Sequence, residues 1–304
     1  MAGFFRNFSR SGKGVAKDAP DKKRFVLFFE ILWRKLWQFI GLNIVYFIIV
    51  LPLFAYVSVF IMQSVGIQAA DLAGNTLFVI FGYILNLPSF LMWLLVGASA
   101  VLYGPATCGL TYVLRNFTRR EHAWTFSDFF ERSKQNFKQG LIAGIIDIVL
   151  VLSCSMYVAM DTTALTGSQW YLITFKYIAL IVFIIYFMMR FYIYTLIVTF
   201  NMGFKAIIKN SWIFVILGFF RNLCSVFFIV LSIATSVGYM LAFFGLITPV
   251  FCRYIAVFNG YPVIDKYMLQ PMRKKEEEEG GVTMIEPIFS DDVKSTKENK
   301  SDED

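Results

Sequence analysis

The sequence predicts an all-α, polytopic membrane protein with about six transmembrane helices and cytoplasmic interfacial helices. Two long uncharged runs indicate this, because no charged side chain occurs in residues 36–70 or in residues 72–114. A helix needs only about 20 apolar residues to cross the bilayer core, where charges are costly. A mean hydropathy of +0.63 and 58% hydrophobic residues also exceed what a water-soluble domain can bury.

The positions of the spans follow from the apolar runs and from the basic residues between them. We expect spans at residues 36–62, within 77–114, and at 141–160, 171–200, 223–235 and 238–258. Residues 223–258 can form one long helix or a hairpin of two. With a hairpin, all of the 28 Lys and Arg except Lys176, Arg190 and Arg253 lie on one side of the membrane, together with both termini. The positive-inside rule makes that side the cytoplasm and favours six spans.

The composition divides the chain into three parts. Residues 1–35 form a basic cytoplasmic arm with an interfacial helix, and residues 36–262 form the six-helix membrane domain. Residues 263–304 form a charged cytoplasmic tail. We expect this tail to be disordered, because low hydrophobicity and dense charge do not offset the entropy lost on ordering.

Composition and motifs also argue against several classes of function. The net charge of +7 comes from basic residues beside apolar runs, which favours anionic lipid headgroups over nucleic acid as the partner. His122 is the only histidine, the four cysteines have unrelated spacings, and no phosphate-binding glycine loop occurs. We therefore expect no catalytic residues, no metal, no cofactor and no enzymatic activity.

Three charged residues fall deep inside the predicted spans, whereas Lys176 lies near the end of its span. Counted at about 1.5 Å per residue, Asp147, Arg190 and Arg253 lie roughly 10 to 15 Å from the cytoplasmic ends of their spans. Charges at one depth are not expected to face lipid. They indicate either a polar pocket with a surplus positive charge, suited to an anion, or an Asp147–Arg190 ion pair with Arg253 reaching toward the interface. The sequence leaves both interpretations open.

The loop before the third span contains a second candidate site. Residues 128–138 have the pattern of an amphipathic helix with aromatic and basic side chains, which suits the membrane surface. The candidate contacts for lipid or a partner protein are Phe129, Phe130, Arg132, Lys134 and Lys138. Similar aromatic segments precede the first and fifth spans, which indicates either an internal repeat or a shared requirement for interfacial helices.

One stretch resembles a known family. Residues 104–115 read GPATCGLTYVLR and are followed by Arg119-Arg120-Glu121, Asp128-Phe129-Phe130 and Asn136-Phe137-Lys138-Gln139. This pattern is similar to the signature of the YesL family, with Gly104, Pro105, Thr107 and Asn136 as signature positions. The chain departs from it in a longer connection over residues 63–83 and in its acidic tail.

The resemblance implies a bacterial plasma-membrane protein of unknown activity, associated with carbohydrate uptake transporters and their sensor kinases. Our first hypothesis is therefore a non-enzymatic accessory to carbohydrate uptake or its sensing, which contacts membrane lipids and a carbohydrate transporter or sensor kinase. The alternative is a small transporter or channel for an anionic solute, which would pass the level of Asp147, Arg190 and Arg253. The sequence does not identify the solute, the partner or the oligomeric state.

Overall fold

The computed structural model describes residues 23–64, 82–84, 86–159, 170–239 and 247–278. The chain divides into two compact units, Met1–Leu36 and Trp37–Asp304. The first unit contains α1 (Arg24–Arg34). Among the described residues, the second unit contains α2 (Leu36–Ser64), α4 (Ser89–Arg119), α5 (Thr125–Gln135), α6 (Phe137–Ala159), α7 (Trp170–Thr199), α8 (Phe204–Leu217), α9 (Phe219–Tyr239) and α11 (Thr248–Ile264), followed by the segment described below. Helix α2 begins at Leu36, the last residue of the first unit.

The predicted all-α membrane fold is confirmed. Within the described residues, four helices are long and apolar enough to cross a membrane, namely α2, α4, α6 and α7. They correspond to the four spans predicted up to residue 200. Large apolar side chains on them are exposed, among them Trp93, Ile145 and Ile181, as expected for surfaces that face lipid.

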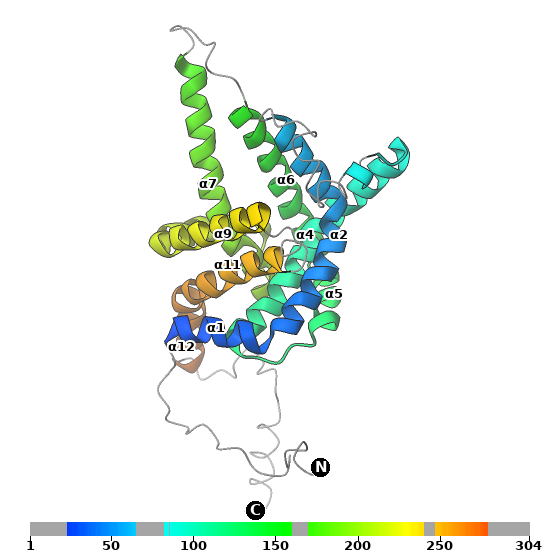
Figure 1. Ribbon diagram of the computed structural model, residues 1–304. Helices are drawn as coiled ribbons and strands as arrows, with labels where there is room; N and C mark the ends of the chain where they lie inside the picture. The colour runs from blue at the N-terminus through cyan, green and yellow to red at the C-terminus, as the bar shows by residue number, and fades with distance from the viewer. Residues whose placement is uncertain (1–22, 65–81, 85, 160–169, 240–246, 279–304) are drawn as a thin grey trace, which may run out of the picture. The chain divides into compact units, whose positions relative to one another are not determined.

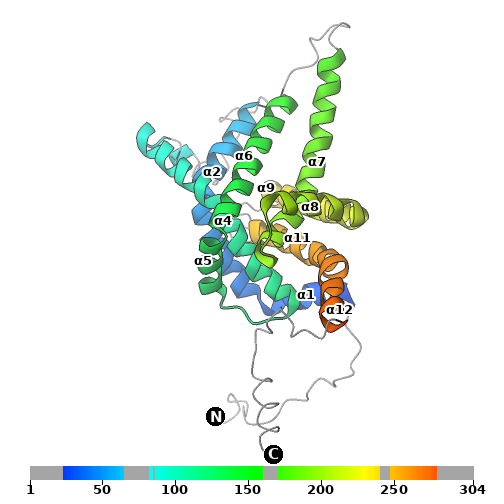
Figure 2. The same ribbon diagram turned by 180° about the vertical axis from the view of Figure 1, so that it is seen from behind.

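The helices after residue 200 do not form the simple hairpin of two spans that the sequence favoured. Helices α8 and α9 meet at a bend of 92° and are long and apolar enough to enter a membrane only as a pair, which is the geometry of either a broken span or a re-entrant loop. Both α9 and α11 run across the direction of α7 (Figures 1 and 2). Residues 223–258 thus contain two helices, and residues 240–246 between them lie outside the described residues. A total of six spans remains a prediction.

Contacts with α7 accompany the bend between α8 and α9. The Tyr192 hydroxyl of α7 donates to Asn222 Oδ1 on α9 at 2.8 Å. A Cβ atom at Gly218, the residue at the bend, would lie only 2.6 Å from that hydroxyl oxygen. A glycine therefore allows the turn to pack directly against α7.

The chain stays helical beyond the last predicted span, where a disordered tail was expected. Beyond α11 the chain continues as a π-helical turn, η3 (Asp265–Leu269), and then as α12 (Gln270–Glu278). The expected disorder is therefore wrong for residues 263–278, where Leu269 is buried and Gln270 Nε2 donates to Asp265 Oδ2 at 3.0 Å. Residues 279–304 lie outside the described residues.

Glycines bring α4 and α6 into backbone contact. A Cβ at Gly104 would collide with the backbone of Gly140, and a Cβ at Gly144 would lie 2.8 Å from Gly104 Cα. Gly140 and Gly144 are four residues apart on one face of α6, the spacing at which small residues let membrane helices approach closely. This crossing is the geometric basis of the site described below, because Tyr103 and Asp147 lie within one helical turn of it.

We predict that Gly144→Ala destabilises the protein, because the added methyl group meets backbone atoms of α4 and forces the helices apart. Overpacking of this kind costs about 1–3 kcal/mol. Thermal unfolding of the purified protein in detergent measures the loss. The matched control is Gly97→Ala on α4, where a Cβ would meet nothing within 4 Å, so that substitution should be neutral or stabilising. Equal effects of the two substitutions would contradict the close crossing.

Candidate functional site

A buried carboxylate lies where α4, α6 and α7 meet. Asp147 of α6 is 3% exposed. Its Oδ1 accepts a hydrogen bond from the Tyr186 hydroxyl at 2.6 Å, and its Oδ2 accepts from Tyr194 at 2.7 Å and from Tyr103 at 3.4 Å. Three hydroxyl groups from two neighbouring helices thus replace the water that a buried carboxylate has lost.

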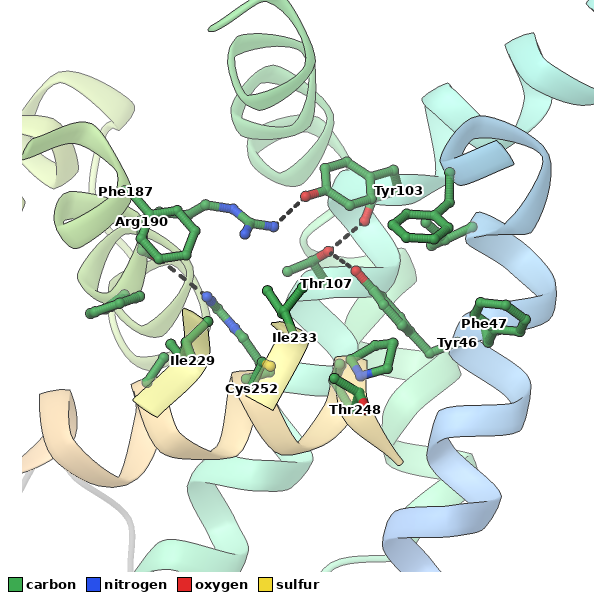
Figure 3. A pocket seen from close by; sticks show the side chains of 17 residues that line it. Tyr46, Phe47, Tyr103, Thr107, Phe187, Arg190, Ile229, Ile233, Thr248 and Cys252 are labelled. Carbon is green, nitrogen blue, oxygen red and sulfur yellow. Dashed lines mark hydrogen bonds between the residues drawn. The ribbon is translucent and has the colours of Figure 1, made fainter. Parts of the chain in front are cut away.

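Arg190 of α7 supplies the opposite charge. Its Nε lies 2.6 Å from Asp147 Oδ2, which makes a partly buried ion pair between α6 and α7. Its Nη2 donates to the Tyr103 hydroxyl (Figure 3). That hydroxyl can accept from Arg190 while it donates to Asp147, so the three side chains form a continuous network.

Arg253 of α11 is the third charged residue at this level, and it is 7% exposed. Its Nε donates to Thr111 Oγ1 at 2.8 Å, and its Nη1 donates to the backbone carbonyl of Arg190 at 3.3 Å. The guanidinium carbon lies 4.7 Å from the centre of the Tyr194 ring. Arg253 is therefore held inside the helices and does not reach toward the interface.

One part of the Arg253 guanidinium has no partner. Within the described part of the chain, no hydrogen-bond acceptor reaches its buried Nη2. The nearest carboxylate in the network, that of Asp147, is already paired with Arg190. A buried donor without an acceptor is costly, and it marks the position where an additional group would be stabilised.

The two arginines line a cavity of about 230 Å³ (Figure 3). Side chains from α2, α4, α7, α9 and α11 enclose it, and most of them are apolar. The hydroxyl groups of Tyr46 and Thr107, 3.0 Å apart, lie along one wall. Thr107 Oγ1 also donates to the Tyr103 carbonyl at 2.7 Å, so Tyr46 is the donor in the pair.

The charges at the cavity do not balance. No Asp or Glu is among the residues that line it, and Asp147 behind Arg190 is the one carboxylate in contact with the network of described residues. Two guanidinium groups therefore face one carboxylate, which leaves one surplus positive charge. The Asp147–Arg190 ion pair of the second interpretation is present, whereas Arg253 lines the cavity as in the first interpretation.

The structure gives packing roles to the signature positions. Gly104 forms the close crossing with α6, and Pro105 lies inside α4 beside Gly140. Thr107 joins the cavity wall. Asn136 caps the C-terminal end of α5, and its backbone N–H and side-chain Nδ2 both donate to the Arg132 carbonyl at 3.1 and 3.0 Å.

The second candidate site becomes a polar groove at the junction of α5 and α6. Arg132, Lys134 and Lys138 line a groove of about 600 Å³ together with the end of α7 around Thr199. Phe130, Lys134 and Lys138 are exposed. Residues 128–138 are not one helix, because α5 ends at Gln135 and α6 begins at Phe137.

Phe129 requires a correction, because it is 0% exposed and unavailable as a surface contact. A Cβ at Gly109 would collide with the Phe129 carbonyl, which shows how closely α5 packs against α4. Arg132 is only partly exposed, because its guanidinium packs 4.5 Å from the centre of the Tyr112 ring.

Sequence reasoning did not identify the tyrosines that surround Asp147. A signal for two of them was present, since Tyr186, Arg190 and Tyr194 are spaced by four residues and must share one face of a helix. Arg115 was also missed as a structural residue. It is buried, and its Nη1 donates to the Val198 carbonyl at 2.9 Å, which ties the end of α4 to the end of α7.

Comparison with known proteins adds one finding. Residues 72–159 match a family described as "Protein of unknown function, DUF624". This segment contains α4, α5 and α6 with Tyr103 and Asp147, whereas Arg190 and Arg253 lie outside it. No curated protein and no solved structure matches the chain.

We predict that Asp147 and Arg190 are energetically coupled. Removing one partner leaves a buried charge unpaired, so Asp147→Asn or Arg190→Gln should each destabilise by about 3–5 kcal/mol, and the double variant should lose less than the sum. Thermal unfolding in detergent measures the cycle. Tyr186→Phe serves as the control for loss of a hydrogen bond without loss of charge, with a smaller expected cost of about 1–2 kcal/mol. Additive losses for the two charged residues would show that they do not interact.

Proposed function

We propose that this chain is a non-enzymatic membrane protein that binds a small anion in the cavity beside Arg253 and carries it across the membrane. The observation that supports this most directly is the buried Nη2 of Arg253, which has no hydrogen-bond partner among the described residues and belongs to a cavity whose described lining contains no carboxylate. A bound anion would accept this hydrogen bond and balance the surplus charge.

Two features favour carriage over catalysis. Asp147 accepts hydrogen bonds from three tyrosines and Arg190, so it is poorly placed to take a proton from a substrate. The cavity is also bordered by α9, the second helix of the bent α8–α9 pair, through Ile229 and Ile233. Broken helices beside a site enclosed by several helices are typical of secondary transporters.

We predict that small anions stabilise the protein against heat through Arg253. The probes are the sodium salts of acetate, benzoate, phosphate and sulfate, tested on the protein in detergent at constant ionic strength. An anion present at about 100 times its dissociation constant adds about 2.7 kcal/mol to the free energy of unfolding. Arg253→Met should remove this effect. The matched control, Arg221→Met, changes an exposed arginine on α9 and should keep it.

Two results would contradict the proposal. One is the absence of any stabilising anion in the panel, and the other is the same stabilisation in the Arg253→Met variant. The transport step is tested with the stabilising anion in proteoliposomes, where Arg253→Met should abolish uptake and Arg221→Met should not. Uptake that does not depend on Arg253 would contradict carriage through this cavity.

A second candidate function is the accessory role in carbohydrate uptake or its sensing. Its support is the resemblance to the YesL family together with the exposed Phe130, Lys134 and Lys138 at the α5–α6 junction. In this proposal the protein lies in a bacterial plasma membrane with both termini in the cytoplasm. The α5–α6 junction would contact anionic lipids and a carbohydrate transporter or sensor kinase.

We predict that Lys134→Glu combined with Lys138→Glu abolishes co-purification with such a transporter or kinase, because the charge reversal repels an acidic partner surface. The measurement is mass spectrometry of proteins recovered in mild detergent, normalised to the amount of folded bait. Lys205→Glu combined with Lys209→Glu is the matched control, since both lysines are exposed on α8. Unchanged recovery of the transporter or kinase in the first variant would contradict the accessory role of this junction.

A further inference from the structure

We infer that the ligand of the cavity is a monovalent carboxylate with a compact apolar body. This inference rests on the proposed anion binding and specifies its chemical class. Three properties of the cavity lead to it, namely the charge it leaves unbalanced, the character of its walls and its size.

The charge count favours a single negative charge. Asp147 lies 2.6 Å from Arg190 and neutralises it, whereas Arg253 has no carboxylate partner among the described residues. A monovalent anion brings the network to neutrality. A dianion such as hydrogen phosphate would leave a net negative charge among apolar helices, where uncompensated charge is costly.

The donors suit a carboxylate group. Arg253 Nη2 has no acceptor among the described residues. Arg190 binds Asp147 and Tyr103 through its Nε and Nη2, so neither of these two contacts uses its Nη1. Both arginines line the cavity. A carboxylate has two acceptor oxygens, and guanidinium groups bind them in short, charge-assisted hydrogen bonds.

The rest of the wall requires an apolar body. The apolar side chains of the lining include Phe47, Phe54, Leu110, Phe187, Ile229 and Ile233. Figure 3 shows Phe187, Ile229 and Ile233 around the space beside the Arg190 side chain. A small hydrated anion would leave these surfaces in contact with water, whereas a hydrocarbon group would exclude it.

The volume limits the size of that body. The cavity measures about 230 Å³. A dry apolar cavity of about 150 Å³ holds one benzene molecule in a protein core. The present cavity therefore has room for one aromatic ring, or a short alkyl chain, together with a carboxylate group. Benzoate is accordingly the probe of choice.

The experiment compares four probes by calorimetry on the full-length protein in detergent: benzoate, acetate, benzyl alcohol and phosphate. Benzoate should bind at least tenfold more tightly than each of the others. Acetate lacks the apolar body, since each buried methylene is worth about fourfold in affinity. Benzyl alcohol lacks the charge, and phosphate has the wrong charge and no apolar group. Arg253→Met should lower the affinity for benzoate at least tenfold and leave the affinity for benzyl alcohol unchanged.

A pair of variants on α9 tests the apolar wall without disturbing the charges. Ile233 lines the cavity and is 40% exposed, so Ile233→Gln should be tolerated by the fold. This substitution should lower the affinity for benzoate severalfold and leave the affinity for acetate unchanged. The control is Val230→Gln, at an exposed position of the same helix that does not line the cavity, which should leave both affinities unchanged.

The outcomes separate this inference from the proposed function. If phosphate or acetate binds as tightly as benzoate and the binding requires Arg253, the anion site stands and the amphipathic class is wrong. If no anion requires Arg253, both are wrong. A series of alkyl carboxylates identifies the source of the ligand. Affinity that peaks at six to eight carbons supports the compact body and indicates a water-soluble acid, whereas affinity that still rises at sixteen carbons indicates a membrane fatty acid and contradicts the compact body.

Discussion

The neutralisation of one buried carboxylate determines how the central helices are placed. Asp147 lies among apolar helices where an unpaired charge would be prohibitive. Its hydrogen-bond donors come from Tyr103 on α4 and from Tyr186, Arg190 and Tyr194 on α7. Three helices must therefore meet at one depth and in one rotational setting. The glycine contact between α4 and α6 permits this, because it lets the backbones approach within one turn of Asp147.

The same network also creates an imbalance. Arg253 is positioned by Thr111, by the backbone carbonyl of Arg190 and by the ring of Tyr194. These contacts orient its guanidinium without neutralising it, since none of them carries a negative charge. Two arginines and one carboxylate thus lie beside a cavity with mostly apolar walls. A structural ion pair needs only Asp147 and Arg190. The positive charge of Arg253 is therefore not required to neutralise Asp147.

Features that depend on a fixed length, such as the bilayer thickness or the rise of a helix per residue, were predictable from the sequence. The four long spans followed from the bilayer thickness, and the common depth of Asp147, Arg190 and Arg253 followed from the constant rise of a helix. Features set by tertiary contact were not. The 92° bend at Gly218 depends on packing against Tyr192, and the burial of Phe129 depends on the absence of a side chain at Gly109. The helical segment 263–278 was also missed, because its polar composition concealed the buried Leu269.

Crystals grown with 4-bromobenzoate would show whether the surplus charge of Arg253 holds an amphipathic anion. Anomalous scattering from bromine locates the ligand independently of the protein phases. We expect the carboxylate within hydrogen-bond distance of Arg253 Nη2 and the bromine beside Ile229 and Ile233 on α9. A cavity without the ligand, in which Arg253 Nη2 is instead hydrogen-bonded to a carboxylate of the protein itself, would contradict it.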